Sequence, residues 1–220
     1  MMVAKAAGLL YVANPKTGTR SVYRWLREQF GGRLVQDHLR QIPNRALHTA
    51  GMVFWTTVRN PYDRIASAWW STTMREEDRY HHREVLDELY GAHGLLEYVR
   101  WLLDDPAAAR CRYRGHTWSR SNQTAFLAPA RPHLSLILKT EDLPQALRRL
   151  PGACRMKVNR FPRENVSHAR PRTIDLLTPQ IVELVNAWAG PDFDEFGYER
   201  IAPHAASSGG DAPNQDVRRT

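Results

Sequence analysis

The chain has 220 residues, a length that favours one domain with room for a sizeable hydrophobic core. It carries 31 Lys and Arg residues against 23 Asp and Glu, and the net charge of +8 suits an anionic partner. The basic residues are scattered, without a long basic block or an aromatic RNA-binding motif, which argues against a nucleic-acid partner.

Apolar runs and helical patterns alternate along the first third of the chain. The run "GLLYVA" (8–13) predicts a first strand, and apolar residues at helical spacing predict a helix over 19–30. The apolar, β-branched run 52–58 predicts a second strand. An Asn-Pro pair follows it and suits the start of a helix over 61–73.

The same alternation continues to the C-terminus. Helical patterns cover 84–103 and 179–188. A third strand is predicted over 133–139, and a short helix is predicted in "EDLPQALRRL" after it. Alternating strands and helices predict an α/β fold, a single P-loop-like domain of three layers with helices on a mostly parallel central sheet. We expect this domain over 1–202 and a disordered, small-residue and polar tail over 203–220.

The loop "NPKTGTRS" (14–21) after the first predicted strand has the order of an anion-binding turn. A strand, a turn and a helix place backbone N–H groups at a helix N-terminus, where the dipole favours an anion. The loop offers a glycine for close approach, three hydroxyl groups and a positive charge: Gly18, Thr17, Thr19, Ser21 and Lys16. The lysine precedes the glycine, and the chain lacks the Gly-Lys-Ser/Thr of ATP- and GTP-binding loops. A plain strand-to-helix turn is the alternative interpretation.

A second candidate anion site lies in "TTVRNPYDRIASAWW" (56–70). Arg59 stands at the end of the second predicted strand, at the sheet edge where ligands bind in open α/β folds. Ser67 lies two turns into the next helix. Arg59 could hold a phosphate through a bidentate fork, and Ser67 could add one hydrogen bond. The alternative is an ordinary capped helix with Asp63 and Arg64 exposed to water.

Together the two elements resemble a known family. "PKTGTRS" is similar to the 5′-phosphosulfate loop of sulfotransferases that use 3′-phosphoadenosine-5′-phosphosulfate (PAPS), and "VRNPYDRIASAW" is similar to their 3′-phosphate motif. Four later segments resemble the carbohydrate sulfotransferase branch in matching order: "NQTAFL" (122–127), "LILKTEDL" (136–143), "RENVSHARP" (163–171) and "DFDEFGY" (192–198). The sequence departs from the family at Arg20, where many members carry a small hydroxyl residue.

The resemblance implies sulfuryl transfer from PAPS to a hydroxyl group of a carbohydrate or similar acceptor. Lys16 would stabilise the charge that develops on the oxygen bridging phosphate and sulfate as the bond between this oxygen and sulfur breaks. The resemblance places the 5′-phosphate on the loop, whose cofactor-binding residues would be Lys16, Thr17, Gly18, Thr19, Arg20 and Ser21. Arg59 and Ser67 would bind the 3′-phosphate. Positioning and charge stabilisation would do most of the work, and this scheme requires no metal.

An acceptor hydroxyl also needs a group that takes its proton, and histidine suits this role at neutral pH. His38 lies between the loop helix and the second predicted strand, where related sulfotransferases commonly place a catalytic or acceptor-binding residue. His48, just before that strand, is the alternative, and an acidic residue is the third possibility.

Two other functions stay open from the residues alone. A P-loop kinase or nucleoside triphosphatase would depend on magnesium, and a non-catalytic polyanion-binding protein would show a steep salt dependence. We expect a cytoplasmic protein without a membrane span, because no secretory signal and no sufficiently long apolar stretch is present. Two widely separated cysteines fit a reducing compartment.

Overall fold

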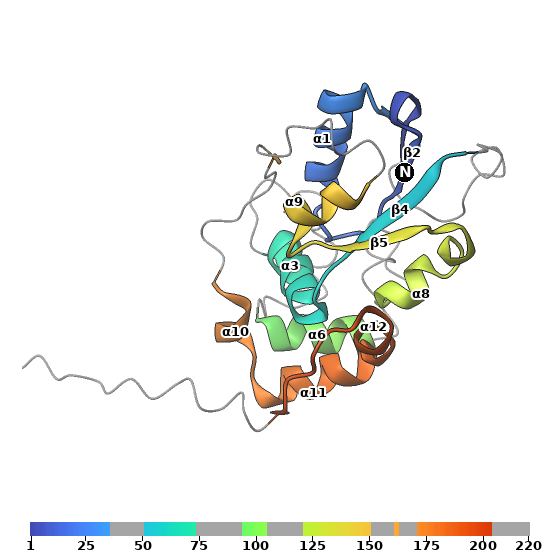
Figure 1. The fold of residues 1–220 in the computed structure, drawn as a ribbon. Helices are drawn as coiled ribbons and strands as arrows, with labels where there is room; N and C mark the ends of the chain where they lie inside the picture. Colours follow the sequence, from blue (N-terminus) through green and yellow to red (C-terminus); the bar gives the residue numbers. More distant parts are fainter. Residues whose placement is uncertain (36–50, 74–93, 105–120, 151–160, 163–170, 204–220) are drawn as a thin grey trace, which may run out of the picture.

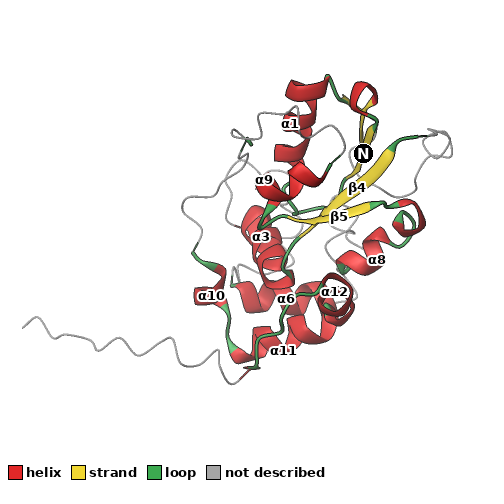
Figure 2. Cartoon of the chain, in the orientation of Figure 1, coloured by secondary structure: helices red, strands yellow, loops and turns green. Residues whose placement is uncertain are grey.

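The computed structural model of the chain describes residues 1–35, 51–73, 94–104, 121–150, 161–162 and 171–203. Within these residues, helices surround one five-stranded sheet of order β3-β1-β2-β4-β5 (Figures 1 and 2). The strands are β1 (Met2–Ala4), β2 (Leu9–Val12), β3 (Arg33–Leu34), β4 (Val53–Val58) and β5 (Leu136–Lys139). Strands β2, β4 and β5 are parallel, whereas β1 pairs antiparallel with both β2 and β3. The chain is thus α/β, but the sheet is mixed, and the prediction of a mostly parallel sheet is wrong.

The antiparallel edge is built by β1, which precedes the first predicted strand, and by β3, which follows α1. After β1 the chain turns through the 3₁₀ helix η1 (Lys5–Ala7) and through Gly8, whose φ of 63° suits a residue without Cβ. This turn returns the chain beside β1, so that Met2 lies opposite Tyr11. A turn this short joins antiparallel strands only, because parallel strands need a longer crossover.

The helices agree with the sequence where local start and stop signals are strong. They are α1 (Thr19–Phe30), α3 (Pro61–Thr73), α6 (Leu95–Asp104), α8 (Gln123–Leu127), α9 (Leu143–Ala146), α10 (Thr173–Leu176), α11 (Pro179–Trp188) and α12 (Gly190–Phe196), with 3₁₀ turns η2 (Arg131–His133) and η3 (Leu147–Arg149). The predicted bounds of α1, α3 and α11 are confirmed. The third strand is shorter than predicted, because η2 takes His133 and β5 begins only at Leu136. Helices α8, α10 and α12 were not predicted.

Alternate residues of the central strands face two layers of helices. Leu9 and Tyr11 of β2 pack in one cluster with residues of α1 and α9. Leu10 and Val12 point to the other face and pack with residues of α8 and α12. A third cluster joins α3 to α6, α11 and α12, which Figure 1 shows below the sheet and away from α1. Helices therefore cover both faces of the sheet, and the ends of its strands are left to the connecting loops.

Two of the sequence predictions fall largely outside the residues that the structure describes. The predicted helix over 84–103 is described only from residue 94, where it contains α6, and the predicted tail lies outside the described residues beyond residue 203. None of the helices in the described ranges combines the length and apolar character that a membrane crossing requires.

Candidate functional site

The candidate site lies where the parallel strands β2, β4 and β5 end side by side. Strand β2 leads into the loop 14–18, β4 leads into Arg59, and β5 leads into Thr140. The Thr140 hydroxyl joins these segments, because its Oγ1 lies 3.0 Å from the Thr17 carbonyl oxygen and 2.9 Å from that of Val58. The two segments that the sequence identified as anion sites are therefore neighbours in space.

The loop before α1 bends through two residues in the left-handed region. Lys16 has a φ of 65° and is the only non-glycine residue with positive φ in the described part of the chain, while Gly18 has a φ of 77°. This conformation costs a residue with a Cβ about 1–2 kcal/mol, so contacts around Lys16 have to hold it there. Gly18 is the N-cap of α1, and the first bond within the helix joins the Val22 N–H to the Gly18 carbonyl. The N–H groups of residues 19–21 consequently have no acceptor within the helix.

Buried hydroxyl groups hold this loop against the sheet. Thr17 is fully buried, and its Oγ1 donates to the Asn14 carbonyl at 2.7 Å and lies 2.7 Å from Thr57 Oγ1. The Tyr11 hydroxyl also lies 2.7 Å from Thr57 Oγ1, and burial raises the pKa of Tyr11. Thr19 Oγ1 donates to the same Asn14 carbonyl at 2.8 Å. The hydroxyl groups of Thr17 and Thr19 thus shape the loop, and contacts to an anion would come from its backbone N–H groups.

The Lys16 side chain reaches from the loop to α3. Its Nζ donates to Ser71 Oγ, which lies 3.0 Å from the Ala68 carbonyl oxygen. Ser67 lies one turn before Ser71, so the two serines share one face of the helix. Ser67, which is half-buried, therefore lies on the side of α3 that Lys16 contacts.

Arg59 lies half-buried beside the loop. Its Nη1 is 3.4 Å from the Lys16 carbonyl oxygen, the long end of a hydrogen bond. Its backbone is held at both polar atoms by one side chain: the Arg59 N–H donates to Gln123 Oε1 at 2.9 Å, and its carbonyl accepts from Gln123 Nε2 at 2.8 Å. The guanidinium group that the family resemblance assigns to a 3′-phosphate thus adjoins the loop that it assigns to a 5′-phosphate.

Gln123 itself was not predicted as a site residue. It is fully buried at the start of α8, and its Oε1 also accepts from Asn14 Nδ2 at 3.1 Å. The Asp192 carboxylate, also fully buried, accepts from the backbone N–H of Gln123 at 2.9 Å and from that of Thr124 at 2.8 Å. Gln123 and Asp192 each lie in a segment that resembles the sulfotransferase family, but neither was given a role from the sequence. Asn122, whose side chain accepts the Ala125 N–H as the N-cap, is a local signal that could have identified this helix start.

Arg64 is a second residue whose place the sequence missed. One interpretation put it on the exposed face of its helix, whereas only 2% of the residue is exposed. Its Nε donates to the Pro15 carbonyl at 3.2 Å and its Nη1 to that of Ser121 at 3.0 Å, and the guanidinium lies 5.8 Å from the Trp188 ring centroid. Burial lowers the pKa of Arg64 to about 10, and the Asp192 carboxylate opposes that shift. Arg64 is still charged at neutral pH, which places a buried positive charge against the loop 14–18.

Glu141 and Tyr198 hold the other side of the Arg59 segment. Glu141 Oε1 accepts from the Asn60 N–H at 2.7 Å, and the Tyr198 hydroxyl donates to Glu141 Oε2 at 3.0 Å. Asn60 Oδ1 accepts from the Tyr62 N–H at 3.0 Å at the start of α3. Burial raises the pKa of Tyr198, Glu141 raises it further, and Arg59 opposes the increase, as expected of a phenol that lies near both charges.

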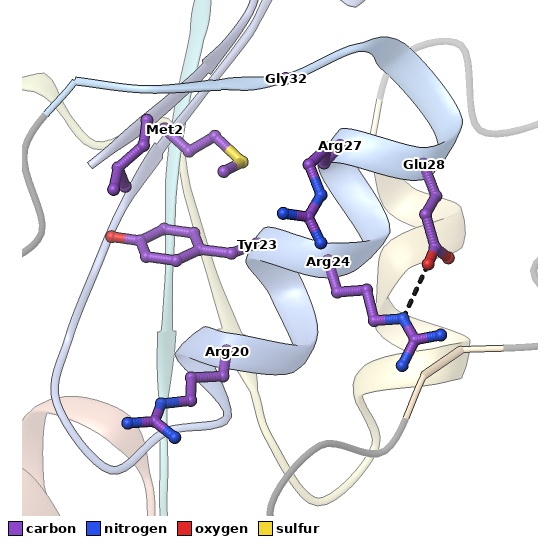
Figure 3. Close-up of a pocket in the computed structure, with 8 residues that line it drawn as sticks. Met2, Arg20, Tyr23, Arg24, Arg27, Glu28 and Gly32 are labelled. Carbon is purple, nitrogen blue, oxygen red and sulfur yellow. Dashed lines mark hydrogen bonds and ion pairs between the residues drawn. The ribbon is translucent and has the colours of Figure 1, made fainter.

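A basic groove of about 440 Å³ runs along the outer face of α1 (Figure 3). Three arginines at helical spacing share its wall with apolar and acidic residues: Met2, Arg20, Tyr23, Arg24, Arg27, Glu28, Gly32 and Leu34. Arg24 pairs with Glu28 at 2.7 Å. The groove begins at Arg20, in the first turn of α1, so it starts beside the end of the loop.

The two predicted bases, His38 and His48, lie outside the described residues. Across the described ranges, no group of three or more His, Cys, Asp or Glu side chains is placed to hold a metal ion. Comparison of the chain with protein-family models, with curated proteins and with solved structures finds no match.

Proposed function

We propose that the chain is a PAPS-dependent sulfotransferase of P-loop-like architecture that transfers a sulfuryl group to a hydroxyl of a carbohydrate or similar acceptor. The observation that carries the proposal is the juxtaposition of two anion-binding segments. Parallel pairing of β2 with β4 sets the loop 14–21 beside Arg59, and the Arg59 guanidinium reaches the Lys16 carbonyl. A nucleotide with a phosphorylated 3′ position and a 5′-phosphosulfate presents anions that suit this pair of segments.

Each part of the site has a role in this proposal. The backbone N–H groups at the start of α1 would bind the 5′-phosphate, and Arg59 with Ser67 would bind the 3′-phosphate. The acceptor oxygen would attack sulfur in line, the bond from sulfur to the bridging oxygen would break, and 3′,5′-ADP would leave. Lys16 would stabilise the charge that develops on the bridging oxygen. The acceptor proton would pass to His38 or His48.

Ligand binding tests the cofactor assignment. We expect 3′,5′-ADP to bind more tightly than 5′-AMP, and Arg59→Ala to remove most of the difference. Loss of a charge-assisted contact costs roughly 1.5–3 kcal/mol, or about 10- to 150-fold in affinity. Arg149→Ala, which removes an exposed arginine of η3, is the matched control. Equal binding of 3′,5′-ADP and 5′-AMP by the unmodified protein, or tighter binding of ATP with magnesium, would contradict the proposal.

The arginine groove on α1 favours a second candidate function, the binding of a polyanion without catalysis. Its wall carries three arginines and one glutamate. Under this alternative, Arg27→Gln would weaken binding of a sulfated polysaccharide, the affinity would fall steeply with salt, and 3′,5′-ADP would have no effect. Sulfuryl transfer from labelled PAPS to a glycan would decide for the enzyme.

A further inference from the structure

We infer that Gln123 is a positioning residue that fixes the separation of the two anion-binding segments and thereby the preference for a ligand with two phosphate groups. The inference rests on the proposed function, because it assigns the two segments to one nucleotide. Gln123 would act through the backbone of Arg59 and the side chain of Asn14, which belong to different segments.

The Gln123 amide uses its full hydrogen-bonding capacity on these neighbours. Oε1 accepts from the Arg59 N–H at 2.9 Å and from Asn14 Nδ2 at 3.1 Å, while Nε2 donates to the Arg59 carbonyl at 2.8 Å and to Asp192 Oδ2 at 3.2 Å. Two donors thus face the oxygen and two acceptors face the nitrogen, which defines the orientation of the amide. Any rotation of this buried side chain would leave several polar groups unpaired, so it holds one position.

Asp192 fixes the base of this arrangement. Its carboxylate accepts two backbone N–H groups at the start of α8 in addition to Gln123 Nε2. The carboxylate is fully buried, and the positive charge of Arg64 lies close enough to interact with it. A continuous set of buried polar contacts therefore runs from α12 through Gln123 to Arg59.

The separation of the segments matters most for a ligand that contacts both. A ligand with one phosphate needs only one segment in place, whereas a ligand with two phosphates gains its second contact only if both are correctly spaced. Loosening Gln123 should therefore reduce the affinity for 3′,5′-ADP more than the affinity for 5′-AMP.

Gln123→Glu provides the test, because it keeps the shape of the side chain and replaces the Nε2 donor by an oxygen. The ionised variant would set a carboxylate oxygen against the Arg59 carbonyl and Asp192. The protonated variant regains a donor. Burial beside the Asp192 carboxylate raises the pKa of the introduced carboxyl above that of an ordinary glutamate. We expect Gln123→Glu to lower the preference for 3′,5′-ADP over 5′-AMP by about tenfold at pH near 8, and to recover it as the pH falls towards about 5. Gln180→Glu, on an exposed residue of α11, adds the same charge. At each pH it should show the same preference for 3′,5′-ADP over 5′-AMP as the unmodified protein.

Amide hydrogen exchange of the unmodified protein supplies a readout that needs no variant. Saturating 3′,5′-ADP should slow exchange in residues 123–127 and 190–196, which Gln123 and Asp192 connect to the site, and 5′-AMP should slow it less. If the unmodified protein binds both nucleotides equally, the proposed function fails and this role fails with it. If it prefers 3′,5′-ADP but Gln123→Glu matches Gln180→Glu, or if exchange in these segments does not respond, the positioning role alone is overturned.

Discussion

Two substitutions of Lys16 separate the charge of its side chain from the strain of its backbone. Lys16→Ala removes the ammonium group and its bond to Ser71 but leaves a Cβ at a φ of 65°, whereas Lys16→Gly removes the Cβ as well. The left-handed conformation costs a residue with a Cβ about 1–2 kcal/mol, and the greater freedom of glycine in the unfolded chain offsets about 0.4–1 kcal/mol of that gain. We therefore expect Lys16→Gly to be more stable than Lys16→Ala by about 1 kcal/mol, or roughly 2–4 °C in Tm for a chain of this size.

Activity should respond in a different way from stability. Both variants lack the ammonium group, so both should lose most of the sulfuryl transfer from labelled PAPS. Both should keep most of their affinity for 3′,5′-ADP, because that product lacks the sulfate. Thermal melts and calorimetric titrations on the same preparations give the two quantities. A glycine variant no more stable than the alanine variant would refute the strain at Lys16, and equal losses of turnover and affinity would reduce Lys16 to a binding residue.

Three further predictions concern the hydroxyl network and the bases. Thr57→Val should lower the free energy of unfolding by about 2–3 kcal/mol, because the buried Thr57 hydroxyl contacts three polar atoms. Thr56→Val removes one such hydrogen bond and should lower it by about 1 kcal/mol. Equal losses in chemical denaturation would contradict the hydroxyl network. Burial raises the pKa of Tyr11, so its contribution to stability should be complete below about pH 10 and lost as the pH rises through the folded-state pKa. In urea melts, Tyr11→Phe should reduce the fall in the free energy of unfolding at alkaline pH. A pH profile that does not change would mean that other groups cause this fall. His38→Ala should lower the rate of sulfuryl transfer by about 10²–10⁴-fold without weakening the binding of 3′,5′-ADP. If only His48→Ala loses this activity, His48 is the general base instead.

Local signals explain which elements the sequence predicted. Helix α1 ends at Gly31, whose φ is 62°, and α11 begins after Thr178, whose side chain accepts the Ile181 N–H. Both signals lie within four residues of the helix end they mark, so a single sequence carries them. Strands β1 and β3 have three and two residues, too few for an alternating pattern, and the mixed sheet could not be foreseen without them.

The candidate site shows the other limit. Its two candidate segments were predicted because a strand, a loop and a helix follow one another in sequence. Gln123 was missed because no helix was predicted over 123–127, and Arg64 was missed because a charged residue in a helical pattern is ordinarily exposed. Their burial is decided by partners far along the chain, such as Asn14 for the first and Pro15 for the second.

The order in which strands pair has a consequence for how the protein folds. Strands β1 and β2 are joined by a tight turn, so their contacts are local and can form early. The pairing of β2 with β4 and of β4 with β5 joins distant segments and must wait for two long loop closures. Because Thr57 and Thr140 hold the loop 14–18 in shape, that loop acquires its conformation only after both pairings are complete. Binding of 3′,5′-ADP at the proposed site should therefore lag behind the formation of secondary structure during refolding and report the last step of assembly.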